Sequence, residues 1–341
     1  MVGRPLWERK VPSSSLGAPI SFMENKTRTF PGWTYQHCPD RDYTLRGDGD
    51  THTIVSVAFQ TPADFESLVL SANYTPRAGE SLLTEVQICQ GGLWSKFFKL
   101  GFYSATEKHS FDEQDDESGC VYVDVLRAAQ PAQAYRYRLT IHGQPDIPTV
   151  TVCTQPAHKE LVPFAEKLPE GARTVPIKPI SQMQLNVSEE LRKRLCSPTA
   201  LCMAMNALGV SVSPDEVMKG VYDSRAQIYG NWTFNTAYAY QCGLDACVTQ
   251  FKRLSQLRNY VSTDSLVVAT IGYGAGELTD AAIAQTAGHL VVICGWNNNL
   301  VQVADPAASQ SDEVIRFYHA AEFARVWLLN KGGMAYLVRK K

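Results

Sequence analysis

Short runs of alternating apolar and polar residues dominate the chain from about residue 40 to residue 155. Tyr or Leu alternates with Arg or Thr over residues 135–140, which is the two-residue period of a half-buried strand. Turn-forming residues separate such runs, as at positions 46–50 and 91–92. We therefore expect an all-β sandwich of the jelly-roll kind. The predicted strands are Thr53–Gln60, Ser67–Ala72, Leu83–Cys89, Cys120–Leu126, Ala134–His142 and Thr149–Thr154.

After about residue 180 the pattern changes to a mixture of helical and strand-like segments. Ser213 is a suitable N-cap, since Asp215 and Glu216 follow it in a first turn. The pattern predicts helices at Pro198–Leu208, Pro214–Tyr222, Thr236–Gln241 and Leu254–Val261, with His319 in a later helical stretch. It predicts strands at Leu266–Ile271, Leu290–Trp296, Leu300–Ala304 and Ala335–Val338.

Two segments without a clear period divide the chain. Residues 1–35 are rich in Pro, Ser, Gly and charge and predict an irregular arm. Prolines recur over residues 156–179, a density that suits an extended linker. The resulting organisation is α+β: an arm over 1–35, a β-sandwich over 36–155, a linker over 156–179 and a mixed domain over 180–341.

Composition narrows the classes of partner. The net charge is -2, so no basic surplus favours nucleic acid. No run of 18 apolar residues predicts a membrane span, and no apolar segment after the first ten residues predicts a secretory signal. The cysteine count is odd, at 9, and includes no C-x-x-C pair. We therefore expect neither a disulfide framework nor a metal or other cofactor. The sequence leaves the compartment open, although the lack of a signal segment and the odd cysteine count favour the cytoplasm.

Cys196 is the first candidate for chemistry. It lies in a Cys-Ser-Pro-Thr turn that leads into an apolar helix, and Pro198 suits the first helical turn. Cys196 thus precedes a helix N-terminus, where free N–H groups and the macrodipole favour a thiolate. A buried core thiol is the alternative reading of this segment, and it is the reading we prefer for Cys202.

One predicted hairpin supplies both a candidate base and a candidate acid to orient that base. His289 opens the apolar strand 290–296, the chain turns at three asparagines, and the returning strand 300–304 ends in Asp305. His289 and Asp305 therefore fall at the same end of the hairpin, within a residue or two of opposite each other. Paired positions bring Cβ atoms to roughly 4.5–5.5 Å, close enough for a carboxylate to hold an imidazole in one tautomer.

These segments resemble the C39-like peptidase family, a branch of the papain-like fold. The resemblance covers about residues 175–340 and is carried by Ser181-Gln182-Met183, Cys196-Ser197-Pro198-Thr199, Gly230–Tyr238, Gly288-His289-Leu290 and Ala304–Ala307. It implies a papain-like cysteine hydrolase domain over 180–341. It also implies Cys196 as nucleophile, His289 as base, Asp305 as orienting residue, and Gln182 in the oxyanion hole. Many family members have Gly where Ser197 stands here.

The resemblance, and not periodicity, selects Gln182 over Gln184, because both would point to the same face of an extended chain. Trp232 and Asn235 are predicted to contact substrate. The alternative for this aromatic block is that it simply packs the domain.

The implied function is a cysteine peptidase or amidase that acts on a peptide or amide through an acyl-enzyme. Two alternatives remain open: a catalytically inactive papain-like binding protein, and an acyltransferase on the same scaffold. For the β domain we expect a binding or targeting role. Aromatics such as Trp33, Tyr35 and Trp94 suggest a carbohydrate or cell-surface ligand, while a spacer is the alternative.

Overall fold

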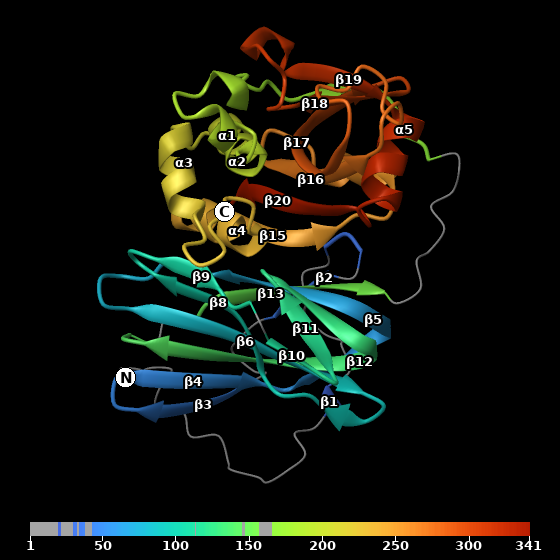
Figure 1. The fold of residues 1–341 in the computed structure, drawn as a ribbon. Coiled ribbons are helices and arrows are strands. Elements are labelled where there is room, and N and C mark those ends of the chain that lie inside the picture. The colour runs from blue at the N-terminus through green and yellow to red at the C-terminus, as the bar shows by residue number, and fades with distance from the viewer. Residues whose placement is uncertain are drawn as a thin grey trace, which may run out of the picture. The chain divides into compact units, whose positions relative to one another are not determined.

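The computed structural model of the protein describes residues 20–21, 30–32, 34–37, 43–112, 114–144, 147–156 and 166–341. As far as they are described, these residues form two compact units (Figure 1). The first contains Tyr35–His158 together with Ser224–Ala226. The second contains Lys159–Asp223 and Gln227–Lys341, and it takes in Phe30–Thr34 from the predicted arm.

The first unit is all-β, as expected. Within the described residues, 13 strands join one sheet, whose main path runs β2-β13-β5-β12-β6-β8-β9. The strands are β1 (Ile20–Ser21), β2 (Thr34–His37), β3 (Tyr43–Asp48), β4 (Thr51–Ser56), β5 (Ala58–Asn73), β6 (Ser81–Gln90), β7 (Leu93–Trp94), β8 (Phe98–Ser104), β9 (Lys108–Ser110), β10 (Gln114–Asp116), β11 (Gly119–Tyr122), β12 (Val125–His142) and β13 (Thr149–Pro156).

Two long strands organise this sheet. The register of β12 against β5 shifts twice between Arg127 and Ala134, and such irregularities let a long strand bend from one layer to another. The predicted strand Thr53–Gln60 is divided between β4 and β5. Seven of the described strands of this unit were not predicted, namely β1, β2, β3, β7, β8, β9 and β10. The inward side chains of β5 and β12 pack as an aromatic cluster, in which the rings of Phe59 and Tyr137 stack 6.2 Å apart.

The second unit combines a seven-stranded antiparallel sheet with helices (Figure 1). The strands are β14 (Arg173–Thr174), β15 (Leu244–Gln250), β16 (Ser265–Tyr273), β17 (Thr286–Asn297), β18 (Leu300–Ala304), β19 (Ile315–His319) and β20 (Met334–Lys340). The main path of the sheet is β15-β20-β16-β17-β18-β19, and β14 pairs with β17. The α-helices are α1 (Glu189–Arg192), α2 (Cys196–Ala207), α3 (Pro214–Val221), α4 (Trp232–Gln241) and α5 (Ala320–Ala324). Short 3₁₀-helices cover Gln182–Gln184, Leu254–Asn259 and Ser311–Glu313, and a π-helix covers Arg325–Leu329.

The predicted elements of this unit exist, with several corrected boundaries. Ser213 caps α3 in a capping box with Glu216, as its sequence predicted. Helix α4 begins four residues before the predicted start, because the Asn231 side chain accepts a hydrogen bond from the N–H of Phe234 and caps it there. The segment predicted as a helix at Leu254–Val261 is a 3₁₀-helix. His319 ends β19 and does not lie within a helix, so that prediction was wrong.

Three strands escaped prediction. Strand β15 has few β-branched residues, and β19 is an edge strand that pairs on one side only. Strand β14 lies inside the segment predicted as the linker, and it pairs Arg173 with Trp296 and Thr174 with Gly295 of β17. No helix among the described residues is long and apolar enough to span a membrane.

Candidate active site

Cys196 is the first residue of α2, which begins two residues before the predicted start at Pro198. The residue before it, Leu195, provides no side-chain cap, so N–H groups of the first turn remain available to the thiol. The Cys196 side chain is partly exposed. Burial raises the pKa of Cys196, but hydrogen bonding and charge from His289, with backbone N–H groups of Leu290 and Ser197, outweigh it and lower the pKa.

His289 lies in β17, opposite Ile271 of β16. It is only 3% exposed. Burial alone would lower the pKa of His289, but the Asp305 carboxylate and the Cys196 thiol raise it to about 10. A lowered thiol pKa beside a raised imidazole pKa favours a thiolate–imidazolium pair near neutral pH.

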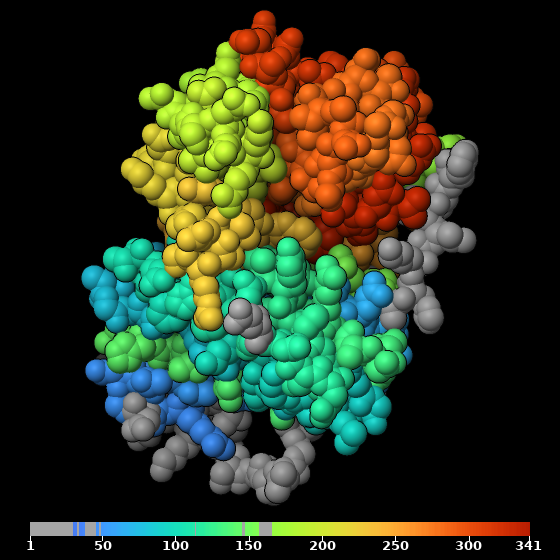
Figure 2. Space-filling model, viewed as in Figure 1, coloured from blue at the N-terminus to red at the C-terminus, as the bar shows by residue number. Residues whose placement is uncertain are grey.

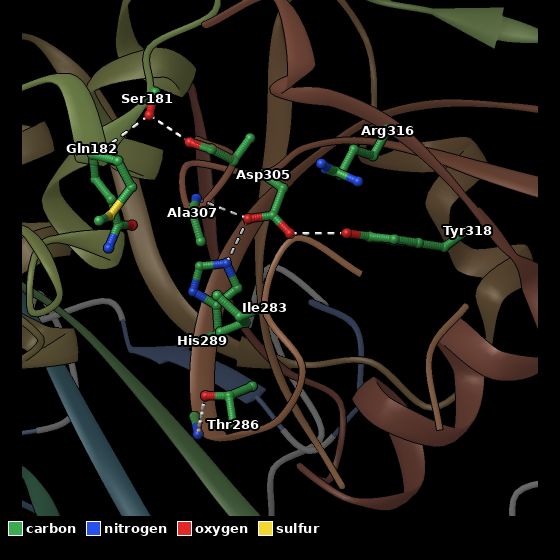
Figure 3. A network of polar contacts seen from close by, with 12 residues as sticks. Ser181, Gln182, Ile283, Thr286, His289, Asp305, Ala307, Arg316 and Tyr318 are labelled. Carbon is green, nitrogen blue, oxygen red and sulfur yellow. Dashed lines mark hydrogen bonds and ion pairs between the residues drawn. The ribbon is translucent and has the colours of Figure 1, made fainter. Parts of the chain in front are cut away.

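Asp305 follows the last residue of β18 and is fully buried. Its Oδ1 lies 2.7 Å from His289 Nε2 (Figure 3). The register of the hairpin places Ala304 opposite Val292, so the two side chains bridge a diagonal and do not stand directly opposite. Because Nε2 is bound to Asp305, the other ring nitrogen, Nδ1, is the one left to face Cys196.

Gln182 and Gln184 have different surroundings. They lie in a 3₁₀-helix that Ser181 caps, so the expectation of an extended stretch was wrong, and the two side chains do not share a face. Gln182 is 3% exposed, and its Nε2 donates to the carbonyl of Arg192 at 2.8 Å. That acceptor fixes the orientation of the amide and leaves its second N–H unused. Gln184 is bound to exposed Gln310 and Ser311.

The Gln182 stretch is tied to the chain after Asp305. The N–H of Gln182 donates to the carbonyl of Pro306 at 2.8 Å, and Ser181 Oγ donates to the carbonyl of Ala308 at 2.5 Å. Figure 3 shows Ser181 and Gln182 near the His289–Asp305 pair. Figure 2 shows a hollow on this face of the second unit, between the yellow-green atoms around the start of α2 and the orange atoms of the β16–β18 region.

Asn235 does not line this hollow. It is fully buried in α4, where Nδ2 donates to the carbonyls of Tyr229 and Asn231 and Oδ1 accepts from Ser197 Oγ at 2.9 Å. These bonds leave no polar atom for substrate, so the predicted substrate contact for Asn235 is not supported. Trp232, at the start of α4, is partly exposed, and its contact with substrate stays a prediction.

Two tyrosines join the site without having been predicted. The hydroxyl of Tyr318 in β19 donates to Asp305 Oδ2 at 2.9 Å, and the hydroxyl of Tyr336 in β20 lies 2.9 Å from Ser197 Oγ. Tyr336 lies 139 residues after Ser197, and Tyr318 lies in β19, a strand that the sequence pattern did not predict. Nothing in the local sequence of either tyrosine marks it. Among the described residues, no group of three or more His, Cys, Asp or Glu side chains could hold a metal ion.

The surroundings of Trp94 and Tyr35 do not support the predicted carbohydrate ligand of the β domain. Trp33 lies outside the described residues. The Arg136 guanidinium covers the ring of Trp94, 4.7 Å from its centroid. Tyr35 is partly buried, which raises its pKa to about 12.

Comparisons with known protein families match the β domain and the mixed domain separately. Residues 174–334 match the Peptidase_C39 like family, and residues 39–156 match the Peptidase C39 N-terminal domain. One similar structure is a double glycine motif protease from an AMS/PCAT transporter in complex with the leader peptide, with 16% identity, TM-score 0.36, and coverage of 52% of this chain and 99% of its own. Another is a putative C39-like peptidase from Bacillus anthracis, with 16% identity, TM-score 0.38, and coverage of 50% and 99%. No curated protein matches the chain.

Proposed function

Residues 174–334 of this chain belong to the C39-like peptidase family, and from that premise we propose that the protein is a cysteine peptidase or amidase that acts through an acyl-enzyme. The observation that carries the proposal is the partly exposed Cys196 thiol beside the buried His289–Asp305 pair. A nucleophile, a base and a group that orients the base are what thiol-dependent acyl transfer requires.

In this mechanism the Cys196 thiolate attacks the carbonyl carbon of a peptide or amide bond. The His289 imidazolium donates its Nδ1 proton to the leaving amine, and the neutral imidazole then takes a proton from the attacking water. Asp305 keeps Nε2 protonated and stabilises the imidazolium through the 2.7 Å bond. The carboxylate remains ionised throughout, because His289 and the donors from Ala307 and Tyr318 outweigh burial and lower the pKa of Asp305.

The oxyanion of the tetrahedral intermediate needs donors that are already in place. We assign this role to the backbone N–H of Cys196 and the second N–H of Gln182. The fixed orientation of the Gln182 amide against the carbonyl of Arg192 supports this assignment. A donor held before the substrate arrives stabilises the developing charge without reorganisation.

The test is to incubate the protein with libraries of peptides and peptidoglycan fragments and to identify the products by mass spectrometry. Cys196→Ala is the matched control, since it removes only the thiol. Products that form with the wild type and not with this variant support the proposal. If the wild type binds peptides without cleaving them or forming an acyl-enzyme, the protein is a binding protein; if added amines capture the acyl group in preference to water, it is a transferase.

A further inference from the structure

Each oxygen of the Asp305 carboxylate is held by a different set of donors. Oδ1 accepts from the His289 ring at 2.7 Å and from the N–H of Ala307 at 3.0 Å. Oδ2 accepts from the hydroxyl of Tyr318 at 2.9 Å (Figure 3). Asp305 is fully buried, so water has no access to replace a lost donor. Tyr318 is therefore the partner that satisfies the second oxygen.

The ring of Tyr318 is fixed by packing. Tyr318 is 1% exposed, and its ring stacks on Phe323 of α5 with centroids 6.3 Å apart and planes 11° apart. Its position in β19 is opposite Val301 of β18, and the long side chain reaches along the sheet to Asp305. A phenylalanine would occupy the same space without the hydroxyl.

Several charged or titratable groups surround this carboxylate. His289 approaches it from β17, and Tyr318 and Arg316 approach it from β19 (Figure 3). Tyr273 of β16 is close enough for the carboxylate charge to raise its pKa, although burial is the larger cause. Burial, and next the charge of Asp305, also raise the pKa of Tyr318, so its hydroxyl remains a donor across the working pH range.

We propose that Tyr318 is a positioning residue that holds the Asp305 carboxylate ionised and aimed at His289. This inference deepens the proposed function and rests on it, because the orientation of His289 matters through the ion pair with Cys196. Tyr318 acts through Asp305 and does not itself touch the reacting atoms.

A positioning role has a consequence that packing alone would not have. Without the Tyr318 donor, the carboxylate is less stabilised and takes up a proton at a higher pH. A protonated Asp305 no longer stabilises the imidazolium, so the thiolate–imidazolium pair reverts to neutral thiol and imidazole. The Cys196 thiolate is then lost at a higher pH than in the wild type.

The experiment compares Tyr318→Phe with the wild type by the rate at which iodoacetamide alkylates Cys196 across the acid range. We expect the acid limb of this profile to move up by about one pH unit. On a cleavable peptide we expect kcat to fall roughly tenfold with little change in KM. Tyr135→Phe is the matched control, because it also removes a buried hydroxyl, one that lies 2.9 Å from a ring nitrogen of His37 in the β domain. It should leave the profile unchanged.

An unshifted alkylation profile in Tyr318→Phe would overturn the proposal, whatever the variant does to thermal stability. A double-mutant cycle with Asp305→Asn gives a second check: if Tyr318 acts through Asp305, Tyr318→Phe should add little to Asp305→Asn, and additive effects would contradict it. Alkylation of Cys196 needs no substrate. The experiment therefore tests the positioning role of Tyr318 independently of the proposed peptidase activity. A shifted profile without any peptide cleavage would support the positioning role and count against the peptidase.

Discussion

Cys196 and His289 shift each other's ionisation in opposite directions. The pKa of Cys196 is lowered and that of His289 is raised to about 10, in each case against the effect of burial. Between these two pKa values the thiol is ionised and the imidazole protonated. Falling pH removes the thiolate, and rising pH removes the imidazolium as it passes about 10.

This difference predicts that Cys196 is the most reactive described thiol. Cys202 and Cys294 are buried, and burial raises the pKa of each to about 12. A limiting dose of iodoacetamide near neutral pH, followed by peptide mapping, should therefore label Cys196 first. The labelling rate should remain high below the ordinary thiol pKa of about 8.5. Prior labelling of another cysteine in the folded protein would contradict the assignment.

Substitutions of Cys196, His289 and Asp305 should lower peptide turnover to different extents. Cys196→Ala and His289→Ala should each abolish peptide turnover. Asp305→Ala should leave measurable turnover, because a displaced imidazole still adopts the productive orientation part of the time. Asp305→Asn should be milder, since an amide oxygen can still accept from the ring N–H. Full kcat in all of these variants would exclude the mechanism.

Gln182 and Gln184 form a matched pair of variants. A side chain that donates to the developing oxyanion acts on the transition state more than on binding. Gln182→Ala should therefore lower kcat by roughly 10²–10³ with little change in KM. Gln184→Ala should resemble the wild type, because its amide bonds to exposed residues. The reverse ranking would move the oxyanion hole to Gln184.

At the scale of elements, a buried polar contact holds the start of α2 in place. Ser197 Oγ bonds to Asn235 of α4 and to Tyr336 of β20, each at 2.9 Å. This contact joins two helices and a strand at the residue that follows Cys196. These two bonds give Ser197 a structural role.

Asn235→Ala should destabilise the protein by about 1–3 kcal/mol, because it leaves buried polar groups without partners. The measurement is the free energy of unfolding in denaturant, with KM determined alongside. Trp232→Ala is the informative comparison, since that side chain is partly exposed and its loss should act on KM. If Asn235→Ala instead raises KM with unchanged stability, Asn235 contacts substrate after all.

At the scale of the whole molecule, the boundary between the domains stays a prediction. The contacts of β14 indicate that the linker ends before Arg173. Arg173 Nη1 donates to the carbonyls of Arg258 and Val261 at 2.8 and 2.7 Å, and its guanidinium lies 5.0 Å from the Trp296 ring centroid. These contacts belong to the second unit. Proteolysis should therefore cut the linker before Arg173, because its recurring prolines predict an extended segment that a protease can reach.

The corresponding experiment compares two fragments that both end at Lys341. One begins at Glu166, whose side chain accepts from the N–H of Leu254 at 2.9 Å, and the other begins at Val175. Both fragments lack Phe30–Thr34. They differ only in residues 166–174, which include β14. The longer fragment should have the higher melting temperature by circular dichroism. Equal melting temperatures would show that β14 adds nothing to the stability of this domain.

The sequence by itself determined the features that depend on short separations along the chain. The strand-rich first half, the capping of α3 by Ser213, and the place of Cys196 at a helix start follow from local periodicity and local caps. The approach of His289 to Asp305 also belongs here, because one hairpin joins them over 16 residues. A hairpin's own register brings such residues together without help from the rest of the fold.

Only the tertiary structure decided the features that depend on the order of strands in the sheet. Asn235 meets Ser197 across 38 residues and Tyr336 meets Ser197 across 139. Tyr318 reaches Asp305 because β19 packs beside β18, and the 3₁₀-turn that separates Gln182 from Gln184 is tied to the chain after Asp305. Periodicity carries no information about which distant strand a residue will face. Buried hydrogen bonds of this kind are set by packing, and they decide which polar side chains support the site and which remain free for substrate.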